Sequence, residues 1–479
     1  MILKKFLYLI LLTPLLTTAA DLEYKAVNKE FWKESQEALK DKNFNKLVNE
    51  SSTKMKVLKK DGLEYAEAQV VLAQGLLNSK IYFGATNILS QVIKNKIGTE
   101  VAKIALSEIE DIAKKMPIDE EAVYGELLND LEFENLPAGL QDFVAYYQGL
   151  YSELKGYKNW SEEDFKKITI DSYWDFKLKY IRAIKDVSEN KIDVAIEKFS
   201  NISNSQVAPQ DLKTQATHQY ARLLFEKGDY PQAYKIFKTV NLNPREKGLI
   251  LLERAWAKYY QKDYGKALGL LAALDAPYFD PARSPEQYIL KMIMYKELCY
   301  YDAAFSVLSA FSSRYALSLK AIKKREDLRK DQMLVNMAVI DKRYEKLVSF
   351  LNLLKTERAL LKEYSWDSYP FYFETLRKYD LKLKEVTDKL NWMLVDKTRE
   401  AANTLLDWKE QLTFLDYQTR LDSLRVLRPQ GEVNYKPEEI PRMSFDKMYW
   451  ENSGEFWIDE LENLKVFVES KCTEEEVLK

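Results

Sequence analysis

Residues 226–233 read EKGDYPQA and residues 261–267 read QKDYGKA, so the unit Asp-Tyr-x-x-Ala occurs twice in the middle of the chain. The final alanines of the two units, Ala233 and Ala267, are 34 residues apart (267 − 233). A 34-residue period with a turn, an aromatic residue and a small residue in fixed order is typical of a repeat made of two helices. Arrays of such repeats present extended surfaces that bind other proteins.

The residues around the first unit suit two antiparallel helices joined by a tight turn. Ala221 and Ala233 are small enough to let the two helix backbones approach closely. Gly228 can end the first helix in the left-handed conformation. Pro231 falls in the first turn of the second helix, where its missing N–H has no partner to lose.

Further copies are less regular. The unit that ends at Ala267 has Lys262 where the first unit has its turn glycine, and Leu271 where the first has Phe237. Other copies are indicated by Ala183, Ile192, Ala195 and Phe199, by Tyr301, Ala304 and Leu308, and by Ala73, Tyr82, Ala85 and Leu89.

These residues resemble the tetratricopeptide repeat (TPR) family over roughly residues 30–95 and 170–350. The resemblance implies an all-α fold, a TPR-like right-handed superhelical solenoid, which we expect to be followed by a long C-terminal helix and a short capping tail. An unrelated all-helical bundle is the alternative.

The chain divides into six expected segments. The run 374–427 lacks Pro and Gly and carries apolar residues at heptad-like spacing, which favours a long helix with a coiled-coil-like seam. Near the C-terminus, Phe456, Leu461, Leu464 and Val468 suit one face of a short helix. The segments are a signal peptide (1–20), N-terminal TPR-like helices (21–117), intervening helices (118–170), a central TPR-like array (171–345), a long coiled-coil-like helical region (346–428) and a Trp-rich C-terminal tail or cap (429–479).

Charge is dense and balanced over the 479 residues, with 72 Lys and Arg against 74 Asp and Glu and a net charge of −2. No basic block or stripe of the kind that neutralises phosphates is present. We therefore expect no nucleic-acid partner.

Residues 1–20 have the pattern of a secretory signal. Lys4 and Lys5 precede an apolar run, residues 6–16, that is too short to span a bilayer, and small residues precede a cleavage site between Ala20 and Asp21. An uncleaved anchor is the alternative. We expect export to a bacterial periplasm, or secretion, and no transmembrane segment in the mature chain.

Two cysteines, Cys299 and Cys472, are present. In an oxidising compartment they could pair and tie the C-terminal tail to the repeats. Two separate thiols are the alternative, because the sequence does not report distance.

Signs of catalysis are few. His218 is the only histidine, so any Ser-His-Asp or Cys-His site would depend on it. Its place in the first helix of a repeat favours a structural role. Neither a two-histidine zinc motif nor a glycine-rich phosphate loop occurs. We therefore expect a protein that is not an enzyme, with no cofactor and no metal.

By the resemblance, first-helix residues line the concave face of the superhelix and contact a ligand. Aromatic residues and arginine are favoured at the centres of protein interfaces. Packing between helices is the alternative role for the aromatic members. The candidate partner-binding residues are Arg222, Phe225, Glu226, Trp256, Tyr259 and Tyr260.

The expected function is that of a non-enzymatic protein–protein interaction scaffold or adaptor in an assembly of the cell envelope, with other envelope proteins as partners. Two alternatives stay open. One is a module that binds cell-wall glycan or a small ligand, and the other is a helical accessory subunit of an enzyme complex.

Overall fold

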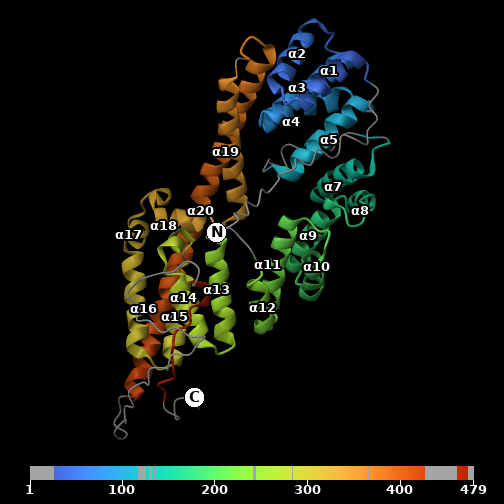
Figure 1. The fold of residues 1–479 in the computed structure, drawn as a ribbon. Coiled ribbons are helices and arrows are strands. Elements are labelled where there is room, and N and C mark those ends of the chain that lie inside the picture. Colours follow the sequence, from blue (N-terminus) through green and yellow to red (C-terminus); the bar gives the residue numbers. More distant parts are fainter. Residues whose placement is uncertain are drawn as a thin grey trace, which may run out of the picture. The chain divides into compact units, whose positions relative to one another are not determined.

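The computed structural model describes residues 26–116, 126–128, 132–133, 135–240, 244–282, 284–364, 366–426 and 461–472. Throughout these residues the regular secondary structure is helical, in helices that pack against their neighbours in sequence (Figure 1). The all-α expectation is therefore confirmed. The signal peptide lies outside the described residues.

The chain forms two compact units. Unit 1 comprises residues 1–175 and 346–389, and unit 2 comprises residues 176–345 and 390–479. Each unit is therefore built from two separate stretches of chain: residues 346–389 join unit 1, and residues 390–479 join unit 2.

The helices of unit 1 are α1 (Lys29–Lys40), α2 (Phe44–Val57), α3 (Leu63–Asn78), α4 (Tyr82–Asn95), α5 (Glu100–Lys115), α6 (Glu126–Leu128), α7 (Ala138–Leu154) and α8 (Lys158–Phe165). The start of α9 (Tyr173–Ser188), most of α19 (Lys342–Glu363) and the first part of α20 (Pro370–Val426) also belong to this unit.

Unit 2 contains the rest of α9, α19 and α20. Its other elements are α10 (Ile192–Asn204), α11 (Gln210–Glu226), α12 (Tyr230–Phe237), α13 (Pro244–Tyr260), α14 (Tyr264–Ala273), η3 (Pro277–Ala282), α15 (Glu286–Glu297), α16 (Tyr301–Arg314), α17 (Ala316–Lys324), η4 (Leu328–Lys330), α18 (Gln332–Ala338) and η5 (Leu461–Asn463).

The same three-residue turn joins helix after helix. Its middle residue is left-handed, and the next amide bonds back into the last turn of the preceding helix, as Asp229 N does to Leu224 O at 2.9 Å. Gly228 has the expected positive φ of 88°, and Lys262 adopts the same conformation with a φ of 62°. Replacement of the turn glycine therefore does not change the turn. The residues at this position are Lys42, Lys80, Gly156, Asn190, Gly228, Lys262 and Cys299.

The small residues of the repeats lie where the helices meet. Ala221 on α11 and Ala233 on α12 are fully buried, as are Ala255 on α13 and Ala267 on α14. At each of these positions a larger side chain would push two helices apart, which explains why alanine recurs at this spacing. Pro231 lies in the first turn of α12, as predicted.

The expected long helix is α20, which extends over 57 residues. Ala401, Leu405 and Leu412 are buried against α15, α16 and α18 in unit 2, and Trp408 and Leu415 pack beside them. The seam predicted from heptad-like spacing therefore packs against helices of the same chain.

The C-terminal tail differs from the expectation. Residues 461–463 form a short 3-10 turn, and residues 464–472 have no regular secondary structure. The helix predicted over Leu461, Leu464 and Val468 is therefore wrong in form, and Phe456 lies outside the described residues. The backbone of this segment bonds instead to other elements, with Val466 N donating to Gly265 O and Lys471 N to Leu298 O. A short helix is marginal in isolation, and these tertiary bonds replace its internal ones.

In unit 1 a helix hairpin, formed by α19 and the first part of α20, caps α4 from far along the chain. Helix α4 has no side-chain cap of its own at Ile81. Phe83 N donates to the Glu357 carboxylate at 2.9 Å, and Gly84 N donates to the Tyr379 hydroxyl at 2.9 Å. The Tyr379 hydroxyl in turn donates to Glu357. These bonds satisfy amides that a helix start would otherwise leave without partners.

Glu357 makes the stability of this cap depend on pH. Burial raises the pKa of Glu357 to about 7, more than the hydrogen bonds from Tyr379 and the α4 amides lower it. Because the folded pKa lies above the usual 4.5, the folded state holds its proton more tightly. The contribution of Glu357 to the free energy of unfolding is therefore greatest below pH 4.5 and falls by about 3 kcal/mol as the pH rises to 7. Hydrogen exchange of α4, corrected for intrinsic rates, should show this loss of protection.

The matched variant is Glu357→Gln, which keeps the shape and an acceptor oxygen but cannot ionise. Protection of residues 82–95 should then be nearly constant between pH 5 and pH 8. An equal decline in both proteins would assign the titration to another group.

Candidate functional site

Five aromatic side chains of α11, α12 and α13 form one continuous cluster in unit 2, which we call the aromatic surface: Phe225, Tyr230, Trp256, Tyr259 and Tyr260. Tyr260 stacks on Tyr230 with 4.6 Å between ring centroids and 10° between planes. Phe225 meets Tyr260 edge-on at 5.6 Å, and Trp256 lies 6.0 Å from Tyr260. The fold thus brings together the four aromatic residues that the sequence singled out.

Carboxylates hold the polar ends of these rings. Trp256 Nε1 donates to Glu286 at 2.7 Å, and the Tyr259 hydroxyl donates to Glu297 at 2.6 Å. Tyr264 donates to the other oxygen of Glu297 at 2.7 Å. Burial raises the pKa of Glu286 and of Tyr259, and the Glu297 carboxylate adds to the rise for Tyr259. Trp256 and Tyr259 are therefore fixed before any partner arrives, which lowers the entropy lost on binding.

Arg222 forms an ion pair with Glu253. Its guanidinium contacts Glu253 at 2.6 Å, and His218 Nε2 lies 2.7 Å from the other oxygen of the same carboxylate. His218 is buried at 9% exposure. Glu226, at the end of α11, is exposed. The two charged candidates thus differ, since Arg222 ties α11 to α13 whereas Glu226 faces solvent.

Exposure varies across the aromatic surface. Tyr260 is 45% exposed, whereas Phe225, Trp256 and Tyr259 are partly buried against their neighbours. The aromatic surface thus has one largely exposed ring, Tyr260, which packs against Phe225, Tyr230 and Trp256. Such a surface offers apolar contact with fixed polar edges, as the centre of a protein interface does.

Tyr230, Tyr264, Glu286 and Glu297 belong to this site and were not among the predicted residues. Tyr230 and Tyr264 are the tyrosines of the two Asp-Tyr-x-x-Ala units, so the repeat itself carried a signal for them. Glu286 and Glu297 come from the next repeat, and no local pattern distinguishes them from the many other acidic residues.

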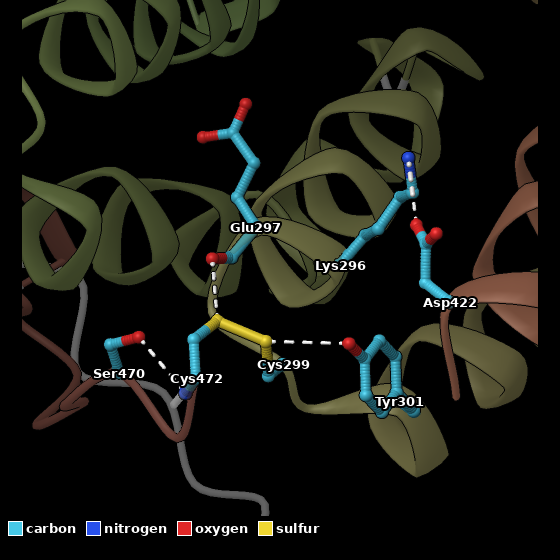
Figure 2. Close-up of a disulfide and its surroundings, with 7 residues drawn as sticks. All are labelled: Lys296, Glu297, Cys299, Tyr301, Asp422, Ser470 and Cys472. Carbon is cyan, nitrogen blue, oxygen red and sulfur yellow. Dashed lines mark hydrogen bonds and ion pairs between the residues drawn. A yellow bond between two sulfur atoms is a disulfide. The ribbon is translucent and has the colours of Figure 1, made fainter. Parts of the chain in front are cut away.

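Residues 461–472, which we call the C-terminal strap, cross α14 and α15 beside this site. Cys472 forms a disulfide with Cys299, the left-handed residue of the α15–α16 turn, with 5.2 Å between Cα atoms. Figure 2 shows the carbonyl of Glu297 facing this disulfide while its carboxylate points away from it. The question that the sequence left open is therefore answered: the two cysteines pair.

Within the described part of the chain, no group of three or more His, Cys, Asp or Glu side chains is arranged to hold a metal ion. None of the helices described there is both long and apolar enough to cross a membrane. Comparison with protein-family models, with curated proteins and with solved structures finds no match to this chain.

Proposed function

We propose that this protein is a non-enzymatic adaptor that binds other proteins through the aromatic surface, and that its repeats form a right-handed TPR-like superhelix. The observation that carries the proposal is the cluster of fixed rings around the solvent-facing Tyr260. Rings held by their own hydrogen bonds and packing lose little freedom on binding, so their contact area contributes more fully to affinity.

The mixture of rings and carboxylates favours a protein partner over a glycan. Sugar-binding sites use flat, exposed rings, whereas here Phe225, Trp256 and Tyr259 are partly buried. Phe225 meets Tyr260 edge-on, and Trp256 meets Tyr259 edge-on. Glu286 and Glu297 would accept hydrogen bonds from amide and basic groups at the rim. An accessory role beside an enzyme would use the same surface.

Export to the periplasm is part of the proposal. The Cys299–Cys472 disulfide supports it, because disulfides persist in oxidising compartments and are rare in the cytosol. The signal-like residues 1–20 support it from the sequence.

The proposal is tested by photo-crosslinking in cells. A photoreactive amino acid replaces Glu226, an exposed residue next to Phe225 of the aromatic surface. A defined set of envelope proteins should be captured. The double change Trp256→Ala and Tyr260→Ala should reduce their recovery by at least tenfold, because interface aromatics often contribute more than 1.4 kcal/mol each.

The matched control is Trp392→Ala, which removes a Trp side chain that is 72% exposed on α20. Capture should be unchanged in this variant. Retention of the protein on isolated cell wall without protein crosslinks would contradict the adaptor proposal and favour a glycan ligand. An equal loss of capture in both variants would also contradict it, because the effect would not be specific to the aromatic surface.

A further inference from the structure

The C-terminal strap lies in a site that has the features of a peptide receptor. Leu461 is buried at 3% exposure in an apolar cluster with residues of α13 and α14, including Leu251 and Leu268. Leu464 and Val468 pack against the same cluster. One inserted leucine followed by two partly buried apolar residues is the pattern by which a short extended segment anchors itself.

A buried guanidinium, that of Arg254, lies next to this apolar cluster. Arg254 on α13 is 2% exposed, lies 5.4 Å over the Tyr234 ring, and donates through Nη1 to Glu462 of the strap at 2.8 Å. Nε and Nη2 of Arg254 are buried and have no hydrogen-bond partner among the described residues. A buried cation is costly without acceptors, so this site requires an anion above it and has unused donors.

The site also binds the main chain of the strap. Lys266 donates to Glu462 O at 2.9 Å and to Leu464 O at 3.2 Å. Burial and the neighbouring Arg254 lower the pKa of Lys266 to about 8. Since these bonds reach main-chain oxygens, they suit any extended segment whatever its side chains.

Gly269 lets the strap lie directly on α14. A Cβ at Gly269 would overlap Leu464 O, closer than two non-bonded atoms can approach. Glycine weakens a helix interior by roughly 0.5–1 kcal/mol relative to alanine. Its place at this contact fits a helix surface shaped to receive a backbone.

We propose that the surface of α13–α15 under the strap is a binding site for an extended segment of a partner protein with the pattern Leu-acidic-x-Leu, and that residues 461–472 occupy it as a ligand in cis. Trp256 and Tyr259 of the aromatic surface pack against the same apolar cluster, but the strap's hydrogen bonds to Arg254 and Lys266 involve none of its rings. The inference does not depend on the function proposed for the aromatic surface. The segment binds by inserting leucine beside an acidic residue that neutralises Arg254.

The partner segment can bind better than the strap does. Glu462 reaches Arg254 through a single hydrogen bond, whereas a carboxylate placed to bind in the bidentate manner would also use a donor that is now without a partner. The Cys299–Cys472 bond offsets this difference, because it keeps the strap at a high local concentration. Without the bond, the strap is tethered by the chain at its N-terminal end alone, so its local concentration falls and a free peptide displaces it more easily.

The test measures binding of a fluorescent peptide with the sequence of residues 461–471 by anisotropy. The receptor is the full chain with the strap disabled by Leu461→Ala, Glu462→Lys, Leu464→Ala, Cys299→Ser and Cys472→Ser. Saturable binding is expected, and it should be at least tenfold weaker for a Glu462→Lys peptide, because that change removes the partner of a buried charge. The disulfide-bonded wild type should bind at least tenfold more weakly than the disabled chain.

The binding surface itself is tested by adding Gly269→Ala to the disabled chain. The change should abolish peptide binding, although alanine stabilises the interior of α14 relative to glycine. Gly139→Ala on α7 is the matched control, because a Cβ there meets nothing within 4 Å. If the disabled chain does not fold, the chain with only Cys299→Ser and Cys472→Ser serves as receptor, and the peptide must then displace the strap.

Three results would overturn the proposal. One is a folded receptor that binds no peptide at 1 mM, which would make the surface a packing site for this chain alone. Another is equal binding by the Gly269→Ala receptor. The third is concentration-dependent dimerisation of the chain without its disulfide, which would assign the site to the strap of a second copy. None of these results bears on crosslinking at the aromatic surface, so the two proposals fail independently.

Discussion

Replacing Ala233 by arginine is expected to unfold the α11–α12 region of unit 2. Ala233 is fully buried where α12 meets α11, opposite Ala221, which is equally buried. An arginine there must either force the two helices apart or bury an unpaired charge. Overpacking costs about 1–3 kcal/mol and an uncompensated buried charge adds several more, so the total loss should exceed about 4 kcal/mol. Chemical denaturation followed by circular dichroism measures it.

The neighbouring change Gln232→Arg is the matched control, because Gln232 is exposed on the same helix turn. Its effect should be within about 0.5 kcal/mol, as for most surface substitutions. Similar stability of the two variants would mean that α11 and α12 are not packed through their alanines, and the repeat architecture would lose its main support.

Loss of the Cys299–Cys472 bond is expected to have the next largest effect. The bond closes a loop with a sequence separation of 173 residues, for which the chain-entropy model gives about 5 kcal/mol as an upper value. Measured effects of native disulfides are usually about 2–4 kcal/mol, and we expect a loss in that range. Urea denaturation of the oxidised protein, with and without dithiothreitol, measures the difference.

The double variant Cys299→Ser and Cys472→Ser separates the bond from other effects of the reductant. It should unfold at the same urea concentration as the reduced wild type and should not respond to dithiothreitol. A wild type that is unaffected by reduction would show that the strap contacts, such as those of Leu461 and Arg254, hold the tail without the covalent link.

Much of the local fold could be predicted from the sequence because its causes are local. Gly228 and Pro231 carry their conformational preferences with them, and the buried alanines follow from spacing alone. The left-handed turns at Lys262 and Cys299 were harder to foresee, since neither residue prefers that conformation. There the packing of two helices decides the turn, and the residue type does not.

The candidate site was predictable only in part. Phe225, Trp256, Tyr259 and Tyr260 were identified because they lie on the first helices of two repeats, at or beside positions that the resemblance places against a ligand. Glu286 and Glu297 enter from the next repeat, where no such pattern marks them. Arg222 was expected to face a ligand, yet it is paired with Glu253. The periodicity shows which face of a helix a residue occupies, but the acceptor that satisfies its polar atom comes from a different helix.

By itself the sequence determined the helical class, the two-helix unit, the long helix α20 and the places of the small residues, because these depend on spacing and on the preferences of single residues. The tertiary structure decided which distant segments meet. The capping of α4 by Glu357, the pairing of Cys299 with Cys472 and the extended strap over Gly269 join residues far apart in the chain. Such contacts arise from complementary burial and unsatisfied hydrogen-bonding groups, which no short window of sequence contains.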